Sequence, residues 1–188
     1  MREKIRILVV DDSAFMRKYI SDMINKEPDM EVIDSAGDGD TAINKIKSLR
    51  PDIVTLDIEM PGKNGLEVLR EVKKTSSAEI IMLSGLTTEG SVTTIEALSI
   101  GAFDFVEKPS GAPFNRMHKI KKDLLNKVRH AWHLKNKRKD ITLKVVDVEK
   151  NIRFKAGGKI EAIALGASTG GPKVLYDVIT NFPKDMKV

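Results

Sequence analysis

The sequence predicts an α/β fold built on a parallel sheet, and two observations support that prediction. Short apolar runs recur five times along the first two-thirds of the chain, separated by segments with the apolar periodicity of helices. The clearest run, Ile53 to Leu56, consists of four residues that suit a strand buried on both faces. Strands that alternate with helices are joined by right-handed crossovers, so we expect helices on both faces of the sheet.

The expected elements follow one another in a regular order. The five expected strands are residues 7–10, 31–36, 53–57, 80–83 and 103–107. Ser13 is placed to cap the first helix, and Asp38-Gly39-Asp40 turns the chain into the second. A last helix is expected from about Asn115, which closes five consecutive strand–helix units.

The composition predicts a soluble protein of the cytoplasm. With 188 residues the chain has room for one domain with a hydrophobic core and part of a second. It has no cysteine, which excludes disulfides and thiolate metal sites. The apolar runs are too short to span a bilayer, and residues 1–4 lead into the first strand without a signal peptide. We therefore expect no direct membrane insertion.

The net charge of +5 is unevenly distributed along the chain. Residues 1–114 contain 14 Lys and Arg against 20 Asp and Glu, whereas residues 115–140 contain 10 against 2. The basic character therefore belongs to the last helix, which we interpret as a solvated face leading into a linker. Docking of an acidic partner or a nucleic acid is the alternative, and we expect no nucleic-acid binding.

Polar side chains follow four of the expected strands at the point where each strand ends. Asp11-Asp12 follows the first strand, Asp57 ends the third, Ser84 follows the fourth, and Lys108 comes shortly after the fifth. The carboxyl ends of parallel strands meet at one rim, where open α/β sheets place their chemistry. Crowded carboxylates repel one another unless a cation intervenes, and Mg²⁺ prefers oxygen ligands of this kind.

The residue types at this rim suit phosphoryl transfer. A metal ion held by Asp12 and Asp57, with Asp11 assisting through water, leaves Asp57 available to attack a phosphoryl group and form an acyl phosphate. The Lys108 ammonium and the Ser84 hydroxyl then neutralise the charge that develops on the transferred group. We therefore expect a Mg²⁺ site next to a phosphate-accepting carboxylate.

This pattern resembles the receiver domain of two-component response regulators over residues 5 to about 125. The residues that carry the resemblance are Asp11-Asp12, Asp57, Met60-Pro61-Gly62, Gly65, Ser84 and Lys108-Pro109. The resemblance implies a flavodoxin-like fold with strand order 2-1-3-4-5, Mg²⁺ dependence and phosphorylation of Asp57 by a histidine kinase. It also implies a metal contact from the Glu59 backbone carbonyl and a switch role for Ser84 and Phe105. For Phe105, simple core packing is the alternative role.

A second motif lies near the end of the chain. Gly166-Ala167-Ser168-Thr169-Gly170 follows an expected strand at residues 160–165 and fits G-x-S-x-G, a turn that exposes a nucleophilic serine. A glycine-rich dinucleotide loop is the alternative, but Pro172 stands where that loop needs its last glycine.

The longer string, Gly166 to Pro172, resembles the nucleophile motif of the chemotaxis protein-glutamate methylesterase family. The resemblance implies demethylation of glutamate esters and deamidation of glutamines on chemoreceptors, with Ser168 as the nucleophile of a Ser-His-Asp triad. The triad His and Asp do not follow in this sequence, so we expect no efficient ester hydrolysis by these 188 residues.

The expected organisation is a receiver domain at residues 1–125, a basic helical extension and linker at 126–158, and the beginning of a methylesterase domain, an α/β fragment, at 159–188. Two other outputs remain open. One is a response regulator with a DNA-binding output, and the other is a stand-alone receiver that acts through protein contacts, with residues 141–188 contributing little.

Overall fold

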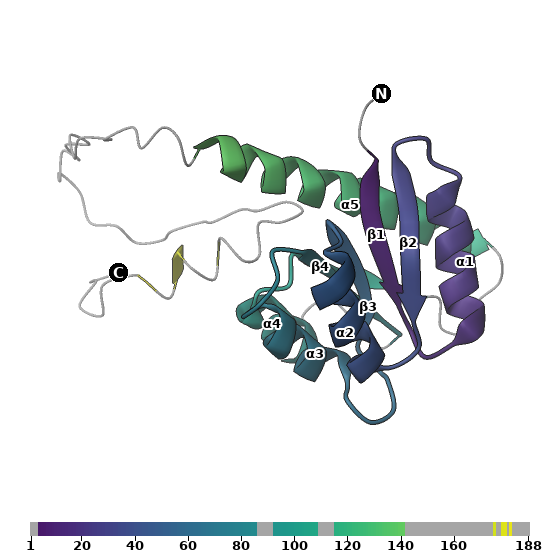
Figure 1. The fold of residues 1–188 in the computed structure, drawn as a ribbon, viewed down its shortest axis with the longest axis horizontal. Coiled ribbons are helices and arrows are strands. Elements are labelled where there is room, and N and C mark those ends of the chain that lie inside the picture. Colours follow the sequence, from purple (N-terminus) through teal and green to yellow (C-terminus); the bar gives the residue numbers. More distant parts are fainter. Residues whose placement is uncertain are drawn as a thin grey trace, which may run out of the picture.

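A parallel sheet with helices on both faces forms the core of the structure (Figure 1). The structure is a computed structural model that describes residues 4–85, 92–108 and 115–141, together with residues 175, 178, 179 and 181. The strands are β1 (Ile5–Val10), β2 (Met30–Ala36), β3 (Ile53–Asp57), β4 (Glu79–Ser84) and β5 (Asp104–Glu107). The helices are α1 (Ala14–Asn25), α2 (Gly39–Leu49), α3 (Gly65–Val72), α4 (Val92–Ile100) and α5 (Asn115–Ile141).

The strand order is β2-β1-β3-β4-β5, and every neighbouring pair is parallel. This order confirms the flavodoxin-like fold, and the observed strands differ from the expected ones by no more than two residues at either end. The Ser13 side chain accepts a hydrogen bond from the Met16 N–H and so caps α1. Asp38 caps α2 in the same way through the Thr41 N–H.

Alternate residues of the strands point into two separate hydrophobic clusters. Leu8 and Val10 of β1 pack with side chains from α2, α3 and α4 on one face of the sheet. Ile7 and Val9 pack with side chains from α1 and α5 on the other face. This division explains why the strands are apolar on both faces and why the sheet is a rigid platform for residues at its edge.

Helix α5 continues without a break past residue 125, where we predicted the receiver to end. Val128 and Ala131 are buried in the same cluster as α1, and the Lys135 ammonium lies 3.2 Å from the Asp52 backbone oxygen. The helix therefore packs against the sheet and α1 between Ile120 and Leu134. The division of the chain into domains remains a prediction, and residues 142–174, including Ser168, lie outside the described residues.

None of the helices in the described parts of the chain has both the length and the apolar composition that a membrane crossing requires. Helix α5, the longest at 27 residues, is strongly charged instead.

Candidate functional site

The register of the sheet places the predicted site residues next to one another. Val10 of β1 pairs with Leu56 of β3, so Asp11 and Asp57 follow side by side. Asp57 is itself paired with β4 one residue before Ser84. The carboxyl ends of these three strands thus form one continuous edge.

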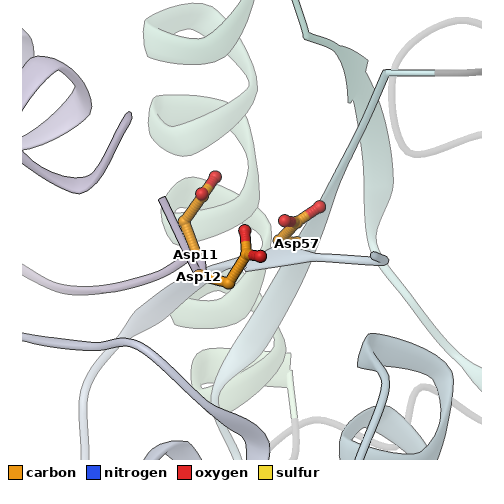
Figure 2. Close-up of side chains that lie close together, drawn as sticks. All are labelled: Asp11, Asp12 and Asp57. Atoms are coloured by element: carbon orange, nitrogen blue, oxygen red, sulfur yellow. The ribbon is translucent and has the colours of Figure 1, made fainter. Parts of the chain in front are cut away.

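Three carboxylates gather at this edge, as Figure 2 shows. Asp11, Asp12 and Asp57 each offer an oxygen that lies within 4.8 Å of the others. Asp11 and Asp57 are almost completely buried, with 0% and 2% of their surface exposed, whereas Asp12 is exposed. The cluster therefore has a buried floor and one side open to solvent.

Lys108 enters the same cluster from the end of β5. Its backbone N–H donates a 2.7 Å hydrogen bond to the Ser84 carbonyl, which continues the pairing of β4 and β5. Its ammonium lies 2.7 Å from Asp11 Oδ2 and 2.6 Å from Asp57 Oδ2. One cation thus bridges the two buried carboxylates.

The remaining oxygens of the buried carboxylates are held by the backbone. Asp11 Oδ1 accepts a 2.9 Å hydrogen bond from the Ser13 N–H, and Asp57 Oδ1 accepts one of 3.1 Å from the Glu59 N–H. Each of these carboxylates therefore has one oxygen fixed by a backbone donor and the other by Lys108. Such fixed dipoles hold charge in place without reorganisation.

Burial and ion pairing shift the pKa values of Asp57 and Lys108 in opposite directions. Burial raises the pKa of Asp57, the Lys108 ammonium lowers it and Asp11 raises it, so the net pKa lies above the ordinary 3.8. Burial lowers the pKa of Lys108, but the hydrogen bonds and charges of Asp11 and Asp57 outweigh burial and raise it. The raised pKa of Lys108 keeps its side chain positively charged, whereas burial opposes the ionisation of Asp57 and the Lys108 ammonium favours it.

The donor set suits a divalent cation. Three carboxylates face a single ammonium, so the cluster carries more potential negative charge than Lys108 neutralises. Asp11 Oδ2 is completely buried and makes no hydrogen bond within the described residues, where only the ion pair with Lys108 serves it. Oxygen-only ligands with one open side are what Mg²⁺ requires, because it retains several waters.

The other predicted residues lie around this cluster in different ways. Ser84 is buried at the end of β4, and Glu59, whose backbone N–H donates to Asp57, has an exposed side chain. The half-buried ring of Phe105 packs against the cluster of α2, α3 and α4, and the Lys127 ammonium lies 5.1 Å from the ring centroid. Their functional assignments, including the Glu59 carbonyl as a metal ligand, remain predictions.

The turn after Asp57 depends on Gly65. A Cβ at this position would lie 2.1 Å from the Asp57 carbonyl oxygen, so only glycine fits. The Gly65 N–H donates a 3.0 Å hydrogen bond to the Ile58 carbonyl, and Asn64 with Glu67 forms a capping box on α3. The start of α3 is therefore held close to the backbone of Asp57.

Arg17 is a site residue that the sequence did not indicate. Its Nη1 donates hydrogen bonds to the backbone oxygens of Asp11 and Asp12, at 2.8 and 2.9 Å. The only signal in the sequence is a basic residue one turn into the helix that follows the acid pair, and such residues are common on exposed helix faces.

Comparisons with known proteins agree with this geometry. The response regulator receiver domain family matches residues 7–120. The chain is 44% identical over 187 residues to the protein-glutamate methylesterase/protein-glutamine glutaminase of Clostridium acetobutylicum, which covers 99% of this chain and 53% of that protein. The chain spans about half the length of the curated relatives it matches.

Solved structures give the same result. The response regulator domain of Thermotoga maritima CheB is 46% identical with a TM-score of 0.66, covering 70% of this chain and 98% of that one. A chain of the CheX–CheY–BeF₃–Mg²⁺ complex from Borrelia burgdorferi is 31% identical with a TM-score of 0.54, covering 65% and 90%.

These matches confirm both resemblances that the sequence motifs indicated, the one to receiver domains and the one to the chemotaxis methylesterases. The edge that gathers three aspartates and a lysine lies within the matched region. The chain belongs to the response regulator receiver domain family.

Proposed function

We propose that this chain is the phosphorylation-controlled part of a chemotaxis response regulator whose output is a protein-glutamate methylesterase and glutaminase. The observation that carries the proposal is the meeting of Asp11, Asp12, Asp57 and Lys108 at one edge of the sheet. The curated relatives match the chain beyond residue 120 as well, which favours this output over a DNA-binding one.

Asp57 is the proposed phosphate acceptor. A carboxylate oxygen of Asp57 attacks the phosphorus of a phosphohistidine on a histidine kinase, the P–N bond breaks, and the leaving imidazole takes a proton from solvent. The product on this chain is an acyl phosphate. Asp11, Asp12, Asp57 and the Glu59 carbonyl would hold Mg²⁺, which would supply positive charge to offset the charge of the phosphoryl oxygens.

Lys108 has a direct part in this step. Its ammonium is held 2.6 Å from Asp57, so it meets the incoming phosphoryl group at the atom that forms the new bond. Ser84 is the last residue of β4 and directly follows Leu83, which pairs with Asp57, so we assign its hydroxyl as a second partner for the phosphoryl oxygens. Phosphorylation then changes the environment of Ser84 and Phe105, which transmit the change to the surface of α4 and β5.

The substrates of the complete protein follow from its relatives' names and from the second motif. Ser168 is the proposed nucleophile toward methylated chemoreceptors, with His and Asp partners supplied by a segment that this sequence does not contain. The unphosphorylated receiver covers the esterase site, and phosphorylation of Asp57 relieves that block.

Labelling by radioactive acetyl phosphate tests the proposal without a kinase. The 188-residue chain should become labelled with Mg²⁺ and remain unlabelled in EDTA. Asp57→Asn should abolish the labelling, whereas the matched control Asp22→Asn, which changes an exposed carboxylate on α1, should leave it intact. Labelling of Asp57→Asn, or labelling that does not depend on Mg²⁺, would contradict the proposal.

A further inference from the structure

Arg17 connects helix α1 to the backbone that carries the two consecutive aspartates. Its side chain is half-buried, and Nη1 alone donates to the Asp11 oxygen at 2.8 Å and to the Asp12 oxygen at 2.9 Å. A guanidinium is a planar, always protonated donor, so these two bonds are independent of pH in the ordinary range.

The two carbonyls that Arg17 binds lie between regular elements. Strand β1 ends at Val10 and helix α1 begins at Ala14, so the carbonyls of Asp11 and Asp12 belong to neither ladder of hydrogen bonds. The Asp11 N–H is held by the Ala36 carbonyl of β2 at 3.1 Å. Arg17 thus holds the carbonyl side of the same segment.

The effect on Asp12 is the most direct. Its exposed carboxylate forms no hydrogen bond or ion pair within the described residues, unlike the carboxylates of Asp11 and Asp57, which a backbone N–H and Lys108 hold. Only the backbone of Asp12 therefore fixes where that carboxylate lies. Two side chains hold this backbone: Arg17 binds the Asp12 carbonyl directly, and Asp11 Oδ1 accepts from the N–H of the next residue, Ser13.

Gly37 provides the space in which the guanidinium lies. A Cβ at Gly37 would come within 3.1 Å of Arg17 Nη1 and 3.4 Å of its Cζ. Contacts this short are tighter than side chains normally tolerate, so an alanine here pushes the guanidinium by a few tenths of an ångström. The φ angle of Gly37 lies outside the left-handed region, so alanine brings no backbone strain of its own.

We propose that Arg17, seated against Gly37, is a positioning residue for divalent-cation binding by Asp11 and Asp12. The proposal rests on the proposed function, because it assumes that the acid cluster binds Mg²⁺. Mutation of residues that orient metal ligands without contacting the metal typically lowers metal affinity by about 10- to 100-fold. Arg17 acts in this way through the backbone rather than through the carboxylates.

An electrostatic role and a positioning role of Arg17 predict opposite changes in Mg²⁺ affinity when its side chain is removed. If Arg17 mattered only as a nearby cation, its loss would relieve repulsion of Mg²⁺ and tighten binding. If it positions the aspartates, its loss lets the Asp12 carboxylate move and weakens binding. The sign of the change in Mg²⁺ affinity therefore separates the two explanations.

The experiment is titration of Mg²⁺ into the 188-residue chain by isothermal calorimetry, with the unfolding free energy in EDTA measured in parallel. We expect Arg17→Met to raise the Kd for Mg²⁺ about tenfold. Gly37→Ala should raise it less, and the double variant should match Arg17→Met alone, since both act through one side chain. Lys18→Met, which removes a neighbouring cation paired with Asp22, should leave the Kd unchanged.

Each result decides the matter. Unchanged or tighter Mg²⁺ binding by Arg17→Met overturns the proposal, even if the variant is less stable in EDTA. If Arg17→Met does not fold, an unchanged Kd for Gly37→Ala overturns it and a raised Kd supports it. Failure of the unmodified chain to bind Mg²⁺ refutes the proposed function itself and this inference with it.

Discussion

Removal of the bridging ammonium, by Lys108→Met, is expected to destabilise the protein strongly when no metal is present. The ammonium lies 2.7 and 2.6 Å from two carboxylates that are 0% and 2% exposed. At an effective dielectric constant of about 20, each attraction amounts to about 6 kcal/mol before desolvation is subtracted. Breaking a buried pair from one side costs about 3–5 kcal/mol net. Lys108 is 16% exposed, so we expect about 3 kcal/mol.

Lys63→Met is the matched control. Lys63 also bridges two carboxylates, those of Asp40 and Glu71 at 2.9 and 3.2 Å, but these side chains are 76% and 41% exposed. Exposed ion pairs are screened by solvent and contribute little, so this variant should lose little stability. The two lysines thus differ mainly in the burial of the carboxylates that they bridge.

Mg²⁺ should restore much of what Lys108→Met loses. A cation that binds only the folded state adds about 2.7 kcal/mol of stability at one hundred times its Kd. The assay is urea unfolding of both variants and the unmodified chain, in EDTA and in saturating Mg²⁺. A loss no larger than that of Lys63→Met, or no recovery by Mg²⁺, would refute the placement of Lys108 among the acidic ligands.

Two further predictions concern the frame around the site. Gly65→Ala places a Cβ against the Asp57 carbonyl oxygen. We expect a loss of about 1–3 kcal/mol in the free energy of unfolding and slower labelling by acetyl phosphate. An unchanged free energy of unfolding would contradict the close contact. Arg129 forms hydrogen bonds with Asp29 and Glu27 and holds the pKa of each below its ordinary value of 3.8 or 4.5. A carboxylate whose pKa is lower in the folded state stabilises the fold at pH values above its ordinary pKa. That stabilisation is lost as the pH falls through the pKa of the folded state. Arg129→Met should therefore cost stability at pH 7 and little at pH values below both folded pKa values, as thermal unfolding across pH will show.

The fold could be predicted from the sequence because strand and helix signals agree with each other along residues 5–141. Apolar runs such as Ile53 to Leu56 are buried as expected, and caps such as Ser13 stand where the helices begin. The convergence of Asp11, Asp57 and Lys108 was also predictable, because a parallel sheet brings the carboxyl ends of all its strands to one edge.

The parts that the sequence did not predict depend on tertiary contacts rather than on local pattern. Lys135 is buried and its ammonium is paired with Asp52, although its neighbours in the sequence form a basic run typical of a solvated linker. Arg17 turns back to the preceding loop instead of facing solvent, which no periodicity records. Lys127 lies over the ring of Phe105, a pairing of residues 22 positions apart.

The most direct test is chemical mapping of the phosphorylated residue. The chain is treated with acetyl phosphate and Mg²⁺, the acyl phosphate is reduced with borohydride, and the modified aspartate is located by peptide mass spectrometry. We predict modification of Asp57 alone, and only when Mg²⁺ is present. Modification of Asp11, of Asp12 or of any residue away from this edge of the sheet, or none at all, would contradict it.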